Sequence, residues 1–130
     1  MPHSQAKLVR VVRGSVIDFA VDLRKSSPTY LQWTSVLLSG GSNKQFFLPK
    51  WCGHAFVALE DDTVFCYKCT EYYCKEAECG IRYDDPAVGL KLPAVGLKLL
   101  DNICFDSSKL IFSDKDRVHP LITEDTDFGF

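Results

Sequence analysis

Residues 7–23, KLVRVVRGSVIDFAVDL, contain two β-strand patterns that are separated by Gly14 and Ser15. The first pattern, 7–13, is apolar and rich in β-branched residues, which favour extended backbone. In the second, 16–23, side chains alternate in character, as expected for a strand with two different faces. One face carries Ile17, Phe19, Val21 and Leu23, and the other carries Asp18, Ala20 and Asp22. The stretch therefore predicts two consecutive strands.

Four more strand patterns follow, at 32–38, 45–48, 53–59 and 63–70. Turn-forming residues separate them, such as SGGSN after the first of the four. No segment shows an extended 3.6-residue period, and only 71–79 has room for a helical turn or two. Six short strands with turns between them predict an all-β fold, an antiparallel barrel or sandwich.

The acidic turn EDD at 60–62 joins the last two strand patterns, and its length predicts a β-hairpin. Pairing Leu59 with Asp62 would place His54 directly opposite Tyr67, with Cβ atoms about 5 Å apart. We therefore expect a pocket in which both rings point inward from neighbouring strands.

The chain beyond Gly80 is less regular. The heptapeptide PAVGLKL occupies 86–92 and again 93–99. One duplication cannot form a solenoid, so we expect an insertion in a surface loop, where added length costs little. The tail from about residue 123 is polar and acidic, and we expect it to be frayed. These features predict one domain over 1–130, with a six-residue leader.

The composition is that of one globular domain, with 130 residues, 46% apolar and 25% charged. No apolar run approaches the ~20 residues of a membrane helix, and the first seven residues lack the apolar segment of a signal peptide. We therefore expect a cytoplasmic protein without a membrane partner. The net charge is −2 and basic residues form no stripe, which argues against nucleic acid as a partner.

Six cysteines are present, and CYKC at 66–69 has the spacing of a zinc knuckle. In a strand, residues three apart point to opposite faces, so Cys66 and Cys69 would not share one metal ion. No second CxxC pair closes a four-ligand site. We therefore expect free thiols, as in a reducing cytosol, and no metal site.

Polar residues on the predicted strands are candidates for chemistry. Asp18 and Asp22 lie on one face of the predicted strand, and if both carboxylates were buried their pKa values would be shifted. For Asp22 we favour a solvated position. Asp18 would be the better candidate for a functional residue if it faced His54. Metal-binding cupin barrels usually carry a His-x-His pair on one strand. Here the residue two positions after His54 is Phe56, so we do not expect a metal enzyme of this type. Tyr67 is a candidate general acid, but on composition alone we favour a packing role for it.

A series of short motifs follows in order along the chain: KLVRV at 7–11, GSVIDFAVDLR at 14–24, SPTY at 27–30 with Gln32 and Trp33, Pro49 with GHAF at 53–56, YKCTEYY at 67–73, Glu78, DDP at 84–86 and SDKD at 113–116. In this order they resemble the dTDP-4-dehydrorhamnose 3,5-epimerase family, cupin-like β-barrels of dTDP-sugar metabolism. The resemblance runs from about Lys7 to about Leu121. No single motif is specific, but their combination is.

The resemblance implies an isomerase of dTDP-L-rhamnose biosynthesis that epimerises dTDP-4-keto-6-deoxy-glucose by proton exchange beside the ketone. In this family a histidine base removes protons at C3 and C5, and no metal or redox cofactor is used. By position, Tyr67 matches the acid, Lys7 the lysine that stabilises the enolate oxygen, and Asp116 the aspartate that orients the catalytic histidine. The matched substrate-binding residues are His54, Asp18 near it, Tyr73 that stacks on thymine, Glu78 and Lys115.

The chain also departs from the family pattern at several positions. The family's base lies in an Arg-Gly-Leu-His segment upstream of the lysine that Lys7 matches, and His3 sits too close to Lys7 to replace it. We therefore expect an N-terminally truncated barrel without the general base. Trp51 replaces a family glycine, which predicts a disturbed turn. The family's Trp-Pro is Leu92-Pro93 here, followed at once by the repeat.

Three functions stay open on the sequence alone. The first is an epimerase that is weak or inactive as this chain. The second is a non-catalytic nucleotide-sugar-binding or interaction module of the same fold, and the third, ranked last, is a cysteine-centred metal or redox protein. The ligand implied for the first two is a dTDP-linked 4-keto-6-deoxy sugar. We also expect a homodimer, because the family dimerises and exposed sheet edges pair readily.

Overall fold

The computed structural model describes residues 3–94, 96–100 and 103–130. Its strands are β1 (Lys7–Arg13), β2 (Ser15–Asp22), β3 (Trp33–Ser39), β4 (Phe46–Leu48), β5 (Cys52–Ala58), β6 (Val64–Cys69), β7 (Lys98–Leu100) and β8 (Ile103–Cys104). The first six agree with the six predicted strands to within one residue at each end. The predicted all-β class is confirmed.

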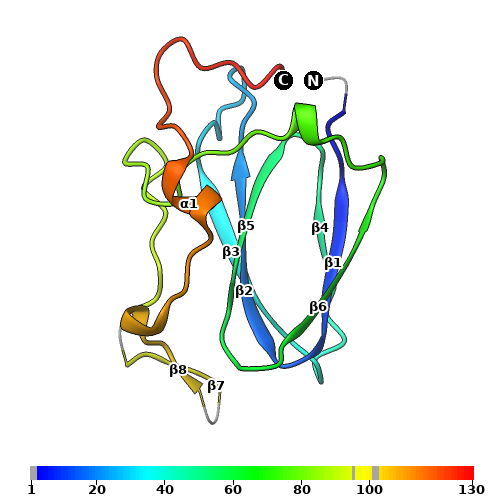
Figure 1. The fold of residues 1–130 in the computed structure, drawn as a ribbon, viewed down its shortest axis with the longest axis vertical. Helices are drawn as coiled ribbons and strands as arrows, with labels where there is room; N and C mark the ends of the chain where they lie inside the picture. Colours follow the sequence, from blue (N-terminus) through cyan, green and yellow to red (C-terminus); the bar gives the residue numbers. More distant parts are fainter. Residues whose placement is uncertain (1–2, 95, 101–102) are drawn as a thin grey trace.

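Two antiparallel sheets, in the strand orders β4-β1-β6 and β3-β2-β5, face each other (Figure 1). The core between them contains Val9, Val11, Val16, Leu38 and Leu48. Gly14 carries the chain from one sheet to the other with φ +81°, where a Cβ would collide with Thr63. Only glycine accepts this conformation without strain. The six strands thus form the expected antiparallel, cupin-like β structure.

Strand β2 is buried on both faces, which makes it the centre of the molecule. Its inner face meets the opposite sheet, and its outer face meets the C-terminal half, which Figure 1 shows alongside β3-β2-β5. Val21 and Leu23 pack there against Phe128, which is 7% exposed. Within the tail that we expected to be frayed, Phe128 is therefore held in place, because its ring covers apolar surface of β2.

The predicted hairpin between β5 and β6 is wrong. Strand β5 pairs with β2, so that His54 lies opposite Ala20, and β6 pairs with β1, so that Tyr67 lies opposite Val9. The turn at 60–62 instead carries the chain from one sheet to the other, as Gly14 does. The physical reason is that β1 and β2 belong to different sheets. Strand β5 forms its backbone hydrogen bonds with β2, and β6 forms its own with β1, so β5 and β6 are in different sheets as well.

Short helical segments complete the chain: η1 (Lys75–Ala77), η2 (Ser107–Lys109) and α1 (Asp114–Val118). Segment η1 lies where one helical turn was expected. Helix α1 was not predicted, although its N-terminus carries a capping box between Ser113 and Asp116, a pattern that is readable in sequence. No helix in the described part of the chain is long and apolar enough to cross a membrane.

The repeated heptapeptide occupies two environments. In the first copy, Val88 and Leu90 pack against the cluster that contains Val21 and Leu23. In the second copy, whose residue 95 lies outside the described residues, Leu97 is half-exposed and the chain enters the projecting β7–β8 pair (Figure 1). The expectation of a surface insertion therefore fits the second copy, whereas the partly buried Val88 and Leu90 hold the first copy against a core cluster.

Asp22 is buried rather than solvated, which corrects the expectation from sequence. Its carboxylate accepts hydrogen bonds from the backbone N (3.0 Å), Nε (3.0 Å) and Nη2 (2.8 Å) of Arg24 and from the hydroxyls of Ser27 and Thr29, both at 2.6 Å. The guanidinium of Arg24 lies 3.7 Å from the ring centroid of Trp51. The Arg24 hydrogen bonds, above all, hold the pKa of Asp22 far below its ordinary value. We call these five residues the Asp22 clamp.

Trp51 does not disturb its turn as predicted. It is not among the described residues with positive φ, and its carbonyl accepts a hydrogen bond from the backbone of Leu23 at 3.2 Å. Its ring has a partner in Arg24, and Arg is a favourable partner for an indole face. The turn therefore accommodates the tryptophan and uses it to close the clamp.

Candidate active site

Asp18 on β2 and His54 on β5 form a polar pair on the inner face. Oδ2 of Asp18 lies 2.9 Å from Nε2 of His54. Asp18 is completely buried, and the His54 side chain is 14% exposed. They meet because β2 and β5 are neighbours and the register places His54 opposite Ala20, two residues from Asp18. A carboxylate oxygen can only accept a hydrogen bond, so the Nε2 atom of His54 carries the proton in this contact. The other ring nitrogen, Nδ1, points away from Asp18.

Two phenylalanines connect this pair to the predicted acid. The ring centroid of Phe65 lies 6.3 Å from that of His54 and 6.2 Å from that of Tyr67. Phe56 stacks on Phe65 at 4.5 Å. Residues two apart on a strand share a face, which puts all four rings on the inner side. We call His54, Phe56, Phe65 and Tyr67 the aromatic row.

The sequence reasoning missed these phenylalanines as part of a site. From the sequence, Phe56 was only evidence against a metal centre, and Phe65 was one more apolar residue of a predicted strand. The available signal was the two-residue spacing of each phenylalanine from a predicted site residue on the same strand. That signal became useful only once β5 and β6 were known to face each other.

Tyr67 on β6 and Lys7 on β1 lie together. Nζ of Lys7 is 5.7 Å from the centroid of the Tyr67 ring. The register places Tyr67 opposite Val9, two residues from Lys7 on the same face. Tyr67 is 60% exposed, so its phenol stands at the open side of the inner face. The pair offers a proton donor beside a cation, with the His54 imidazole further along the row.

A second group of predicted residues lies on the surface. The hydroxyl of Tyr73 donates to Oε2 of Glu78 at 2.7 Å, and Nζ of Lys115 lies 2.9 Å from both Glu78 oxygens. Lys115, and then Tyr73, lower the pKa of the Glu78 carboxyl, and this carboxylate raises the pKa of the Tyr73 phenol. The contact ties the segment after β6 to helix α1. We call these three residues the surface cluster.

Asp116 takes part in a local contact. Its Oδ2 accepts hydrogen bonds from the backbone N of Ser113 at 3.0 Å and from the Ser113 hydroxyl at 2.7 Å. These bonds start helix α1 and thereby position Lys115, the preceding residue, toward Glu78. The structure thus gives Asp116 a capping role, whereas the resemblance implied an orienting role toward a histidine.

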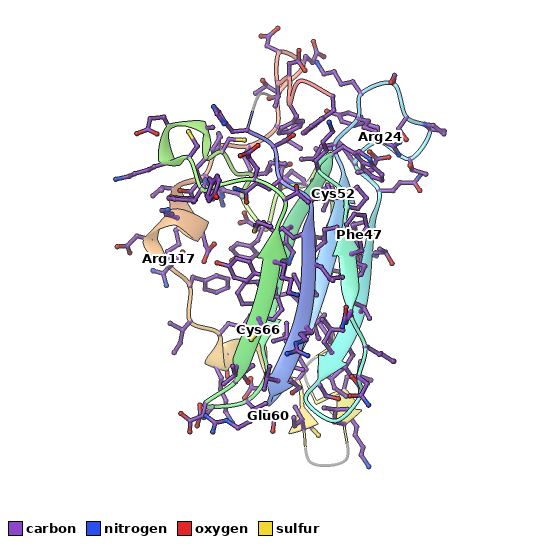
Figure 2. The ribbon with its side chains drawn as sticks, turned by 90° about the vertical axis from the view of Figure 1, so that its right-hand side faces the viewer. Arg24, Phe47, Cys52, Glu60, Cys66 and Arg117 are labelled. Carbon is purple, nitrogen blue, oxygen red and sulfur yellow. The ribbon has the colours of Figure 1, made fainter. Side chains whose placement is uncertain are left out.

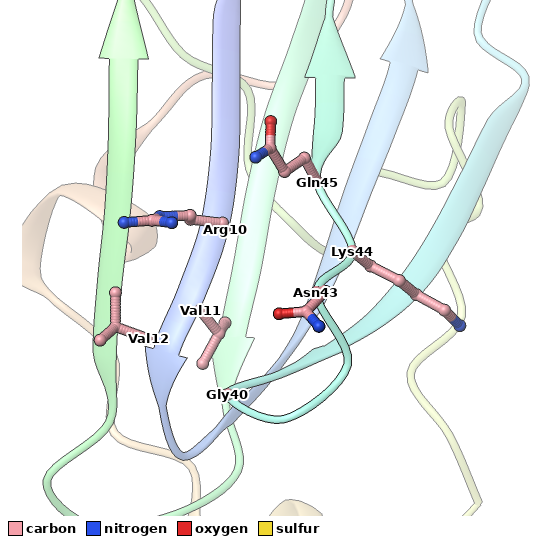
Figure 3. Close-up of a pocket in the computed structure, with 7 residues that line it drawn as sticks. All are labelled: Arg10, Val11, Val12, Gly40, Asn43, Lys44 and Gln45. Carbon is pink, nitrogen blue, oxygen red and sulfur yellow. The ribbon is translucent and has the colours of Figure 1, made fainter.

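A hollow of about 260 Å³ lies between β1 and the connection from β3 to β4. Figure 3 shows its lining, which consists of Arg10, Val11, Val12, Gly40, Asn43, Lys44 and Gln45. None of the predicted site residues belongs to it. Its two cations, Arg10 and Lys44, extend away from each other (Figure 3), so the hollow lacks converging charged groups. We assign it no function.

The six cysteines are free thiols distributed over the molecule. Cys66 and Cys69 both lie on β6, opposite Arg10 and Lys7 respectively, and Cys66 is labelled in Figure 2. Within the described ranges, no three His, Cys, Asp or Glu residues come together in a group that could hold a metal ion. The thiols therefore add nothing to the candidate site.

Comparison with known proteins places this geometry in context. Residues 1–124 match the family model described as dTDP-4-dehydrorhamnose 3,5-epimerase. The dTDP-4-dehydrorhamnose 3,5-epimerase of Methanothermobacter thermautotrophicus is 47% identical over 113 residues, which are 87% of this chain and 56% of the relative. The chain thus spans little more than half the length of this relative.

Solved structures agree with the sequence match. The dTDP-6-deoxy-D-glucose-3,5-epimerase from Legionella pneumophila, in complex with dTDP-4-keto-L-rhamnose, has a TM-score of 0.77 at 39% identity, covering 90% of this chain and 56% of that one. The dTDP-4-dehydrorhamnose 3,5-epimerase from Elizabethkingia anophelis has a TM-score of 0.81 at 33% identity, covering 93% and 60%. With a family model that matches nearly the whole chain and a fold shared with epimerases, the protein belongs to the dTDP-4-dehydrorhamnose 3,5-epimerase family.

Proposed function

We propose that the chain is a dTDP-4-dehydrorhamnose 3,5-epimerase-like protein of dTDP-L-rhamnose biosynthesis, whose inner face binds a dTDP-linked 4-keto-6-deoxy sugar. One observation carries the proposal: the Asp18–His54 pair, Tyr67 and Lys7 line the space between the two facing sheets of a fold whose relatives are epimerases. The keto-sugar in the Legionella relative supports this class of ligand.

The chemistry follows from the weak acidity of a C–H bond beside a ketone. A histidine base, which the family carries in its Arg-Gly-Leu-His segment, accepts that proton. An enolate is left, and a positioned cation lowers the barrier by stabilising its oxygen. Lys7 supplies that cation, and Tyr67 donates a proton to the carbon from the face opposite the base. His54, oriented by Asp18, contacts the sugar. These steps use side chains alone.

As a 130-residue polypeptide the chain is proposed to be a weak or inactive catalyst. Its aromatic row holds the imidazole of His54, which the resemblance matches to a substrate-binding histidine rather than to the base. Asp116 accepts its hydrogen bonds from Ser113 rather than from a histidine. The donor and the cation are present, and the Arg-Gly-Leu-His segment of the family would supply the base.

The alternative is a non-catalytic nucleotide-sugar-binding or interaction module of the same fold. The surface cluster favours it, because Tyr73, Glu78 and Lys115 hold one another in place through contacts that need no catalytic base. The hybrid protein described in the Discussion separates the two functions, because adding the base should restore exchange only where Lys7 and Tyr67 serve catalysis.

Both functions predict that the folded chain binds dTDP, more weakly than an intact epimerase does. Tyr73→Ala removes the ring that would stack on thymine, and we expect the affinity for dTDP to fall about 5- to 150-fold, since such stacking contributes ~1–3 kcal/mol. Isothermal titration calorimetry with dTDP up to millimolar concentration measures the change.

A matched control is Tyr72→Ala. Tyr72 is the neighbouring tyrosine and is 91% exposed, so its loss should leave the affinity unchanged. If the folded, unmodified chain gives no heat with millimolar dTDP, both proposed functions fail.

We also propose that the chain forms a homodimer. Leu8, Val12 and Phe47 are 36%, 49% and 58% exposed on the outer face of β4-β1-β6, where Phe47 is labelled in Figure 2. Among the described strands, β4 and β6 each pair with β1 alone. Apolar surface beside two free edges is suited to association with a second copy.

Phe47→Glu is expected to convert the dimer to a monomer, because a carboxylate would be desolvated in the interface. Ile111→Glu is the control, since Ile111 is 97% exposed on the C-terminal half. Light scattering at high micromolar concentration reports the mass. A strictly monomeric unmodified chain would contradict the proposal.

The proposed location is the cytoplasm. Six free thiols fit a compartment in which glutathione keeps cysteines reduced. The nucleotide-linked sugar proposed as substrate is consistent with the same compartment.

A further inference from the structure

Two members of the aromatic row take no part in the proton chemistry proposed above. Phe65 packs against the core cluster that contains Val9 and Leu48, whereas Phe56 is 49% exposed. Their rings stack with an interplanar angle of 24°. The ring centroid of Phe56 also lies 5.9 Å from that of His54. A supported, half-exposed phenyl ring is thus turned toward the polar groups of the candidate site.

The position of the phenyl pair limits what it can contact. Phe65 stands between His54 and Tyr67, about 6 Å from each, so a hexose that reaches both must lie over the pair. In a 4-keto-6-deoxy sugar, C1 to C4 carry oxygen. The C6 methyl is the one apolar substituent, and it is attached to C5, a carbon whose proton is exchanged. The methyl group is therefore one bond from a reaction centre.

We infer that Phe56, supported by Phe65, forms a subsite for the C6 methyl group and makes the chain selective for 6-deoxy sugars over their 6-hydroxy counterparts. This inference rests on the proposed function. The physical basis is desolvation: a C6 hydroxyl against two phenyl rings would lose its bonds to water without gaining a partner. A methyl group gains contact with the rings and loses nothing.

The competing role is packing alone. Phe65 already fills space in the core, and Phe56 could do no more than cover it. A packing role predicts that changes at Phe56 alter stability and leave sugar selectivity where it was. Selectivity is therefore the property to measure.

The test uses the full 130-residue chain and three stable probes: dTDP, dTDP-glucose and dTDP-6-deoxyglucose, of which the last two differ only in the C6 hydroxyl. Calorimetry should show dTDP-6-deoxyglucose binding about tenfold more tightly than dTDP-glucose, a size typical for one small group in an apolar subsite. Phe56→Ser should reduce that ratio to about one and leave the affinity for dTDP unchanged. Phe56→Leu, which keeps an apolar side chain, should retain part of the ratio.

Ile111→Ser provides the control, because Ile111 is an exposed apolar side chain on the C-terminal half, outside the aromatic row and the proposed dimer surface. It should leave the ratio as in the unmodified chain. Circular dichroism confirms that each variant is folded. If the unmodified chain binds dTDP but shows equal affinity for the two sugars, or if Phe56→Ser keeps the ratio, the inference is overturned while the proposed function stands. No binding of any probe overturns both.

Discussion

The 130-residue polypeptide is expected to exchange the C3 and C5 protons of dTDP-4-keto-6-deoxyglucose with deuterated water about 10²–10⁴-fold more slowly than an intact epimerase, the contribution of a general base. Tyr67 and Lys7 can donate a proton and stabilise the enolate, and they lie 5.7 Å apart, ring centroid to Nζ. The imidazole of the aromatic row, His54, matches the family's second active-site histidine rather than its base. Proton NMR of the sugar in deuterated buffer measures the rate.

A hybrid protein tests whether the missing general base is the reason for the slow exchange. Adding the Arg-Gly-Leu-His segment of a related epimerase before Lys7 should restore exchange, and Tyr67→Phe in the hybrid should lower it again. Tyr83→Phe is the control, because Tyr83 stacks on Phe112 at 4.6 Å and belongs to no part of the candidate site. Rapid exchange by the unmodified chain that His54→Ala abolishes would contradict our proposal and identify His54 as the base.

Asp22→Ala is expected to lower the free energy of unfolding by about 2–4 kcal/mol, in the range for breaking a buried, hydrogen-bonded charge network. The substitution leaves Arg24, Ser27 and Thr29 without the carboxylate that they share. Asp84→Ala is the matched control. Arg82 donates to Asp84 through the same two guanidinium positions, but these side chains are 39% and 42% exposed, so we expect a clearly smaller loss than for Asp22→Ala. Urea denaturation gives both values, and equal losses would contradict the importance of burial.

The clamp also predicts how stability depends on pH. The pKa of Asp22 is lowered in the folded chain, whereas in the unfolded chain it returns to about 3.9. Its contribution is therefore fully present above that value, and it falls as the pH drops below it, because the unfolded chain then binds a proton that the folded chain resists. Between pH 7 and about pH 3, the unmodified chain should lose more stability than Asp22→Asn. Parallel pH profiles would show that Asp22 does not titrate as described.

The strands could be predicted from sequence because the information is local. Alternation within 16–23 and the β-branched run in 7–13 set the backbone conformation of β2 and β1 almost to the residue. Helix α1 was equally local, and its Ser113–Asp116 capping box could have been recognised. The resemblance to a family added the candidate residues, and it did so because the order of motifs survives without knowledge of their contacts.

The pairing of strands could not be predicted in the same way. The turn at 60–62 has the length of a hairpin turn, yet its flanking strands pair with β2 and β1, which lie about thirty to sixty residues away in the chain. The surroundings of Asp22 depended likewise on Arg24 folding back onto its carboxylate and on Trp51, a residue from another part of the sequence whose ring lies against the Arg24 guanidinium.

By itself, the sequence determined the all-β class, the positions of six strands, the family and the candidate residues Lys7, Asp18, His54 and Tyr67. Only the tertiary structure decided which of these residues meet: Asp18 with His54, Tyr67 with Lys7, and Phe65 between the two pairs. It also separated the surface cluster from the inner face. The physical reason is that strand conformation depends on neighbours in sequence, whereas contacts across two sheets depend on which strands pair and on how the core between them packs.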